Sequence, residues 1–228
     1  MFTRENIQLA FKAALPIMLG YVAIGLPCGI LSASIGLNPL QVFLLSAVFY
    51  SGAGQFMIPN MWITLNPLAS IIASVSLVNS RQMLYSASLA PWCTGISRKL
   101  AFWFAASVTD ESFGVNMQKF LEGGWSVQKA TLVNELSHTS WTLSCVVGVF
   151  IGDALGIPLA IASFAMTSIF ICLLVSQKKS SANVVAAVGA ALGVLVCKIV
   201  GLGGAAILLG AIVGVACAVA FSRVRRPR

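Results

Sequence analysis

Long apolar stretches, separated by short polar connections, run through the whole 228-residue chain. Most of them approach or exceed the roughly 20 residues that a helix needs to cross a bilayer. The pattern predicts an all-α polytopic membrane protein with about 6–8 membrane segments, some of them broken or re-entrant. In the first segment, Gly25 and Pro27 predict a kink or a break. The segments cover approximately residues 9–35, 40–64, 67–90, 100–118, 127–152, 158–176, 183–200 and 203–221.

The second segment carries flexible and polar residues at a depth where a lipid-facing helix needs none. They are Gly52, Gly54 and Gln55, which follow Ser51. Backbone that leaves the helical pattern inside a membrane is tolerated only where protein or a water-filled cavity satisfies its polar groups. We therefore expect a helix break over residues 51–55, at a place where transporters tend to bind substrate. Close helix packing through small residues is the alternative, although a buried Gln55 amide needs hydrogen-bond partners.

Ionisable side chains inside the third and fourth segments need one another or a ligand. Arg81 lies about 14 residues into the third segment and cannot deprotonate, so it needs an anion or water. Asp110 and Glu111 follow the apolar run of the fourth segment, where we expect them to end a half-helix. One interpretation is a static ion pair that fixes how the segments assemble. The other is a site for a zwitterionic α-amino acid, with Arg81 on the carboxylate and an acidic side chain on the ammonium.

The fifth segment carries a polar stripe. Its members are spaced 3, 4, 3 and 4 residues apart, at Gln128, Thr131, Glu135, His138 and Thr142. This spacing places them on one face of one helix, which must meet protein or water. Glu135 and His138 are close enough to touch, and a histidine that titrates near neutral pH is a candidate for coupling transport to protons. A hydrogen-bonded His138 inside the bundle is an equally acceptable interpretation.

The composition supports a membrane protein without a soluble domain. Hydrophobic residues make up 58% of the chain and charged residues 9%, whereas soluble domains carry about 25% charged residues. We expect residues 1–228 to form a single transmembrane transport domain. The net charge of +8 does not indicate nucleic acid, because the basic residues sit at segment ends and in the tail. The six cysteines form no C-x-x-C pair, so neither a disulfide framework, a metal site nor a cofactor is expected.

The distribution of basic residues leaves the number of full spans open. Eight simple spans with the N-terminus inside would put Arg98 and Lys99 outside, against the positive-inside rule. If the segments 40–64 and 100–118 are both re-entrant hairpins, every basic cluster falls inside and six full spans remain. The sequence alone does not choose between the two counts.

Two other classes of function compete with transport. Ser51 and His138, the only histidine, suggest a membrane-embedded Ser-His hydrolase, because such a nucleophile needs a base within hydrogen-bond reach. The serine nevertheless lacks the small-x-Ser-x-small turn of many hydrolases, and we expect no enzyme here. A channel or a scaffold subunit is the third possibility, although ionisable residues on three membrane segments argue against a pure scaffold.

Four sequence blocks resemble one protein family in their order and spacing. They are Pro16 with Gly20, the block SGAGQF at 51–56, Asn79-x-Arg81 followed by the block LYSASLAP at 84–91, and the block TDESF at 109–113. They resemble the AzlC/YgaZ family, the large subunits of branched-chain amino acid exporters, strongly over about residues 10–120. Relatives usually carry histidine after the arginine, where this chain has Gln82, so any role of that histidine is in doubt here.

The resemblance implies export of leucine, isoleucine and valine, with methionine as a further candidate. It also implies a small membrane subunit of the AzlD/YgaH type and a multi-pass location in the bacterial or archaeal cytoplasmic (inner) membrane. No family motif defines catalytic residues. Taken together, the residues and the resemblance nominate a substrate-binding set of Gly52, Gly54, Gln55, Asn79, Arg81, Asp110 and Glu111.

Overall fold

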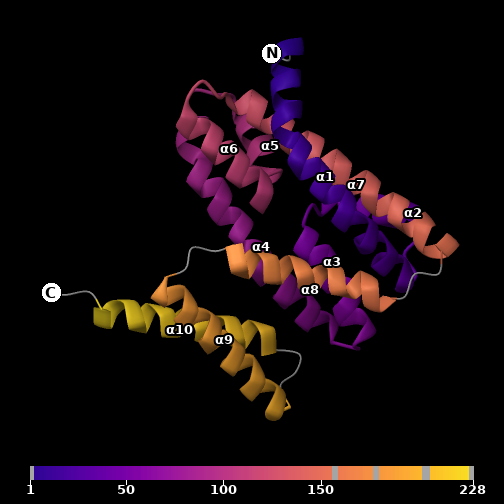
Figure 1. Ribbon diagram of the computed structural model, residues 1–228, viewed down its shortest axis with the longest axis vertical. Helices are drawn as coiled ribbons and strands as arrows, with labels where there is room; N and C mark the ends of the chain where they lie inside the picture. Colours follow the sequence, from indigo (N-terminus) through magenta and orange to yellow (C-terminus); the bar gives the residue numbers. More distant parts are fainter. Residues whose placement is uncertain (1–2, 156–158, 177–179, 202–205, 226–228) are drawn as a thin grey trace. The chain divides into compact units, whose positions relative to one another are not determined.

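The computed structural model describes residues 3–155, 159–176, 180–201 and 206–225, and every regular element in these ranges is a helix (Figure 1). The chain forms two compact units. The first consists of Met1–Asn60 with Val78–Met166, and the second of Met61–Leu77 with Thr167–Arg228. All predicted site residues belong to the first unit. The predicted all-α class is confirmed, while a single transport domain over residues 1–228 stays a prediction.

The first helix, α1 (Arg4–Ser34), runs unbroken through both of its prolines, so no break forms near Gly25 and Pro27, and the alternative of a kink there stays a prediction. The glycines serve helix packing instead. A Cβ on Gly25 would lie 2.7 Å from the Cβ of Ser144, and a Cβ on Gly29 would collide with the backbone of Cys145. Both contacts are with α7 (Val127–Leu155), which lies alongside α1 (Figure 1). Small residues therefore let these two long helices approach closely.

The second predicted segment is divided into α2 (Pro39–Val48) and α3 (Gly52–Ile63). Asn38 caps α2 through a capping box with Gln41, and Pro39 occupies the first turn as expected. The break covers residues 49–51, slightly earlier than predicted. Gly52 to Gln55 form the first turn of α3 rather than an irregular stretch, because Ser51 caps the helix in front of them.

The third and fourth segments form α4 (Leu68–Leu89), a short 3₁₀ turn η1 (Ala90–Cys93), α5 (Arg98–Ala106) and α6 (Asp110–Glu122). Helices α5 and α6 fold back on each other. Phe104 and Phe120 are 16 residues apart, about 24 Å along a straight helix, yet their ring centroids are 6.4 Å apart. Asp110 and Glu111 begin α6, so the expectation that they end a half-helix is wrong.

Helix α7 contributes to the core of the first unit. Val127 and Ala130 pack with Phe104 and Phe120 in a buried apolar cluster. The predicted polar stripe of α7 faces protein, as expected. Thr131 and Thr142 of the stripe are buried. Gln128, Glu135 and His138 are half-buried.

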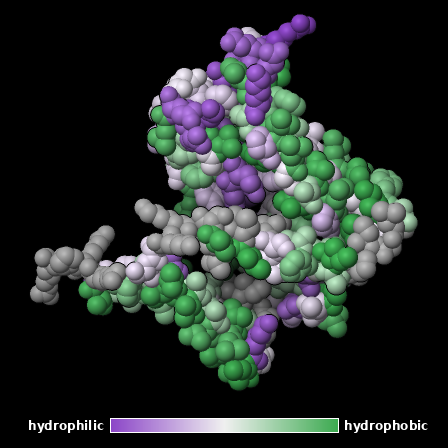
Figure 2. All heavy atoms as spheres, in the orientation of Figure 1, coloured by the Kyte–Doolittle hydropathy of each residue, from purple (hydrophilic) through white to green (hydrophobic). Residues whose placement is uncertain are grey.

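The C-terminal helices are α8 (Leu159–Ser176), α9 (Ser181–Ile199) and α10 (Ala206–Arg225). Within the second unit, α9 and α10 pack through glycines: a Cβ on Gly193 would lie 3.1 Å from the Cα of Gly210, and one on Gly214 would lie 2.6 Å from the carbonyl oxygen of Ala186. Apolar side chains cover much of the face in Figure 2, as expected of surfaces that meet lipid. Among the described residues, α1 and α9 are both long and apolar enough to cross a membrane, so 6–8 segments stays a prediction.

Candidate functional site

An ion pair joins two of the predicted residues within the first unit. Arg81 of α4 holds Asp110, the first residue of α6, with 2.7 Å between Nη1 and Oδ2. The side chains are 30% and 16% exposed, respectively. A guanidinium and a carboxylate removed from water to this extent stabilise each other more than a surface pair does, but they also cost more to desolvate.

The start of α6 places both carboxylates. Thr109 caps the helix, because its side chain accepts from the Ser112 N–H while the Ser112 hydroxyl accepts from the Thr109 N–H. Asp110 and Glu111 therefore occupy the first turn, where the helix dipole favours negative charge. Tyr21 of α1 donates to Glu111 Oε2 at 2.7 Å, and its hydroxyl lies 2.8 Å from Thr109 Oγ1.

The start of α3 lies against α4. The Ser51 hydroxyl donates to Asn79 Oδ1 at 2.6 Å and accepts from the Gly54 N–H at 3.1 Å. Asn79 is therefore bonded to the break, two positions before Arg81. Gly54 has no room for a side chain without adjustment, because a Cβ there would lie 2.8 Å from the Phe49 ring, whereas a Cβ on Gly52 would make an ordinary contact with Trp141 at 3.4 Å.

Gln55 holds the break between α2 and α3 in place. Its Nε2 donates to the Phe49 carbonyl at 2.5 Å, and its Oε1 accepts from Ser46 Oγ at 3.1 Å and Trp141 Nε1 at 3.0 Å. The side chain is 1% exposed. The buried amide thus has the partners it requires. These contacts give Gln55 a positioning role, and direct substrate contact by it stays a prediction.

Tyr50, within the break, lies between two aromatic side chains. Its ring stacks on His138 with centroids 4.1 Å apart and meets the Tyr21 ring edge-on at 6.4 Å. His138 Nε2 lies 3.0 Å from the Ser46 carbonyl. In the part of the chain that the structure describes, no ion pair joins His138 to Glu135, although their spacing permits one.

Two residues of α7 that the sequence interpretation missed fix the breaks. Asn134, fully buried, donates to Ser107 Oγ between α5 and α6 at 3.1 Å and accepts from Asn116 Nδ2 at 2.9 Å. Trp141 donates to Gln55. For Asn134 the signal was available in the sequence, because an asparagine inside an apolar membrane segment requires hydrogen-bond partners from another segment.

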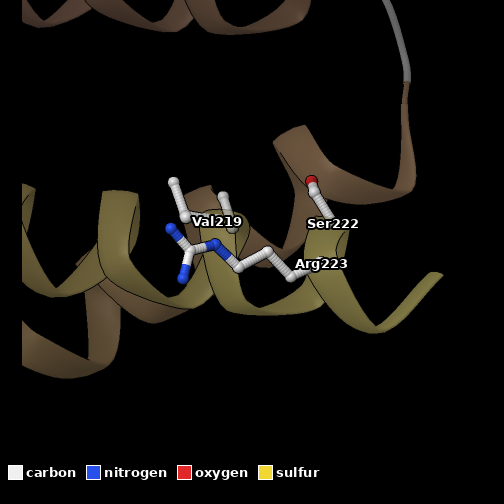
Figure 3. A pocket seen from close by; sticks show the side chains of 4 residues that line it. Val219, Ser222 and Arg223 are labelled. Atoms are coloured by element: carbon white, nitrogen blue, oxygen red, sulfur yellow. The ribbon is translucent and has the colours of Figure 1, made fainter. Parts of the chain in front are cut away.

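Among the described residues, two pockets are lined by neither Arg81 nor Asp110. One, about 190 Å³, lies between α2 and α7 beside His138; its lining is Phe43, Ala47, His138, Thr139, Thr142 and Leu143. The other belongs to the second unit and is formed by α10 (Figure 3); its lining is Ala218, Val219, Ser222 and Arg223. The second pocket contains none of the predicted residues, whereas the first contains His138.

Comparison with known sequences identifies the chain. The family described as AzlC protein matches residues 16–155. This protein belongs to the AzlC family. The matched residues include α2 to α7 and all nine candidate site residues, and they extend the likeness beyond the four sequence blocks to the end of α7.

Several relatives of this AzlC family member are membrane proteins by name. Inner membrane protein YgaZ of Escherichia coli is 32% identical over 196 residues, covering 80% of this chain and 79% of the relative. Branched-chain amino acid transport protein AzlC of Bacillus subtilis is 25% identical over 186 residues, covering 78% and 71%. An uncharacterized membrane protein of Helicobacter pylori is 29% identical over 179 residues, covering 76% and 78%. No solved structure matches. These findings support a membrane location and a role in membrane transport.

Proposed function

We propose that this protein is a secondary transporter that exports branched-chain and other apolar L-amino acids across the cytoplasmic membrane. In this proposal it is multi-pass, is driven by an ion gradient, and works with a small membrane subunit of the AzlD/YgaH type. The observation that carries the proposal is the Arg81–Asp110 pair, 2.7 Å apart and partly buried between α4 and the start of α6. The name of the Bacillus subtilis relative supports the class of substrate.

The pair supplies opposite charges for the two ends of an amino acid. A guanidinium binds a carboxylate through parallel hydrogen bonds, and Arg81 is the residue proposed to do so. Asp110 and Glu111, adjacent in the first turn of α6, are proposed to receive the ammonium. The start of α3, with Gly52 and Gly54, adds a helix N-terminus, which favours anions.

Aromatic side chains next to the charges suit an apolar substrate. Tyr21, which bonds Glu111, meets the Trp141 ring edge-on at 5.3 Å and the Tyr50 ring at 6.4 Å. Rings bury a large apolar area at little cost in conformational entropy. We propose that a branched aliphatic side chain lies against this group when the substrate is bound.

Two further parts of the proposal concern topology and coupling. The α5–α6 hairpin, shown by the contact between Phe104 and Phe120, supports one of the two re-entrant segments that the six-span count requires. Arg98 and Lys99 lie inside in this count if residues 40–64 are re-entrant as well. Glu135 and His138, both half-buried on α7, remain the proposed proton-coupling residues. They would act separately, since they do not pair here.

Efflux of labelled leucine from preloaded proteoliposomes tests the proposal. The measurement is made with and without the co-expressed small subunit and at two pH gradients. We expect leucine loss that requires the subunit and changes with the pH gradient. No loss from folded, reconstituted protein under any of these conditions would contradict the proposal, and loss that ignores the pH gradient would exclude proton coupling.

The rival functions have less support. The Ser51 hydroxyl is bonded to Asn79 and the His138 ring nitrogen to the Ser46 carbonyl, so in the described residues no hydrogen bond links Ser51 to His138. Hydrolysis would require that bond or a rearrangement that creates it. A channel is separated from a transporter by counterflow, because unlabelled leucine loaded inside the vesicles accelerates the entry of external label only through a carrier.

A further inference from the structure

Two buried polar side-chain atoms lack a hydrogen-bond partner among the residues that the structure describes. They are the hydroxyl of Tyr50 and the Nε of Arg81. Buried polar groups are almost always paired, so each exception needs an explanation. Leaving a buried donor unpaired is costly, which makes these two atoms candidates for contact with a ligand.

The two unpaired atoms belong to one connected group of residues. Gln82, the neighbour of Arg81, donates through Nε2 to the carbonyl of Tyr50 at 3.3 Å. Ser51, the residue after Tyr50, donates through its hydroxyl to Oδ1 of Asn79 at 2.6 Å, and Asn79 lies on α4 like Gln82. On the other side, the Tyr50 ring meets Tyr21, whose hydroxyl donates to Glu111. The α4 segment of residues 79–82 therefore lies against the break that contains Tyr50.

The geometry of Arg81 leaves the Nε edge of the guanidinium without a hydrogen-bond partner among the described residues. Asp110 takes Nη1. The guanidinium is planar, and its Nε–H points the same way as an N–H of Nη2, so these two donors form a separate fork. A carboxylate can bind to this second edge in a bidentate manner. The ion pair with Asp110 is not broken when it does.

We propose that Tyr50 is a substrate-binding residue, whose hydroxyl donates to the substrate carboxylate while the Nε edge of Arg81 holds the same group. This inference rests on the proposed function and adds a residue that neither the sequence blocks nor the ion pair identifies. Asp110 keeps its bond to Arg81 throughout binding. Glu111 and the free oxygen of Asp110 are left to the ammonium. Recognition therefore depends on an anionic carboxylate and not only on an apolar amine.

The unpaired hydroxyl gives this proposal an unusual test. Tyr50→Phe removes a group with no partner in the ligand-free protein and keeps the ring that stacks on His138. Ligand-free stability should therefore not fall. The matched control is Tyr21→Phe, which removes a hydroxyl bonded to Glu111 and Thr109 and should lower the melting temperature.

The experiment measures binding of L-leucine and of isoamylamine, which is leucine without its carboxylate. Calorimetry uses the full chain with its small subunit, in detergent, as wild type and as Y50F. We expect wild type to bind leucine at least about tenfold more tightly than isoamylamine. In Y50F we expect leucine to weaken about tenfold or more, the effect of one hydrogen bond to a charged group, and isoamylamine to change less than about twofold.

The outcomes separate this inference from the proposed function. If wild type binds no leucine, the proposed function fails and the inference falls with it. If wild type binds leucine but Y50F binds it equally well, only the inference fails. Three other results would each overturn a carboxylate contact by Tyr50. The first is that Y50F binds both ligands more weakly by the same factor, and the second is that wild type binds both ligands equally well. The third is a lower melting temperature of ligand-free Y50F.

Discussion

Asn134 and Trp141 lie seven residues apart on α7, about two helical turns, and each reaches one of the two helix breaks. Asn134 donates to Ser107 in the break between α5 and α6, and Trp141 donates to Gln55, which holds the break between α2 and α3. One face of α7 thus fixes the starts of both α3 and α6. Those starts carry the residues proposed to meet substrate.

Replacing Asn134 should loosen the start of α6. Asn134→Leu removes the two hydrogen bonds by which this side chain joins α7 to Asn116 and Ser107, each worth about 0.5–1.5 kcal/mol. We expect a lower melting temperature in detergent and reduced leucine transport. The control is Thr139→Ala, which removes a hydroxyl that bonds only within α7 and should change neither. An unaltered melting temperature for Asn134→Leu would refute the role given to this residue.

Gln55 should contribute to the thermal stability of the substrate-free protein, which a residue that only contacts substrate would not do. Gln55→Leu keeps the approximate volume but leaves Trp141 Nε1 and the Ser46 hydroxyl without their acceptor, so we expect thermal stability to drop in the absence of substrate. Gln118→Ala, at an exposed position that bonds only Glu122, is the control. Full ligand-free stability of Gln55→Leu with loss of leucine binding would instead place Gln55 in direct contact with substrate.

Two glycines of α1 should respond in opposite ways to the same substitution. Gly29→Ala introduces a Cβ that collides with the backbone of Cys145, whereas a Cβ on Gly20 meets nothing within 4 Å. We expect Gly29→Ala to lower the melting temperature and Gly20→Ala to leave or raise it, because alanine is favoured over glycine in helices by about 1 kcal/mol. Thermal unfolding of both variants side by side checks this. Equal tolerance would contradict the close packing of α1 against α7.

The α5–α6 hairpin predicts the side of the membrane on which its ends lie. If α5 and α6 enter and leave from the same face, cysteines placed by Lys99→Cys and Lys119→Cys should react with a membrane-impermeant maleimide from the same side. Labelling is compared in right-side-out and inverted vesicles, with the unmodified chain as the control for its native thiols. Labelling of the two positions from opposite sides would show that α5 and α6 together cross the membrane.

The sequence predicted the architecture better than the exact ends of helices. The apolar stretches gave the helices, and the glycines and polar residues indicated the break in the second segment. Its position was shifted because the cap decides where a helix begins, and Ser51 bonding the Gly54 N–H draws Gly52 into the first turn of α3. Likewise, Thr109 with Ser112 starts α6, whereas hydropathy alone assigns Asp110 to the end of the preceding run.

The pairing of residues across helices was predicted in part. Arg81 requires an anion wherever it lies inside apolar protein, and Asp110 was one of few acidic residues available, so their contact follows from charge. His138 forms no ion pair with Glu135 in the described residues; its ring stacks on Tyr50 and its Nε2 lies against the Ser46 carbonyl, both distant in sequence. Spacing along one helix permits a contact, and tertiary neighbours decide whether it forms.

Charge exchange between Arg81 and Asp110 tests the central claim most directly. Leucine efflux and melting temperature are measured for wild type, Arg81→Ala and the double variant Arg81→Asp with Asp110→Arg, all shown to be inserted. If the pair binds substrate, Arg81→Ala abolishes efflux. The exchanged variant regains thermal stability but does not regain efflux, because the carboxylate and the ammonium of the substrate then meet the wrong charges. Recovery of efflux along with stability in the exchanged variant would show that the pair only holds the helices together.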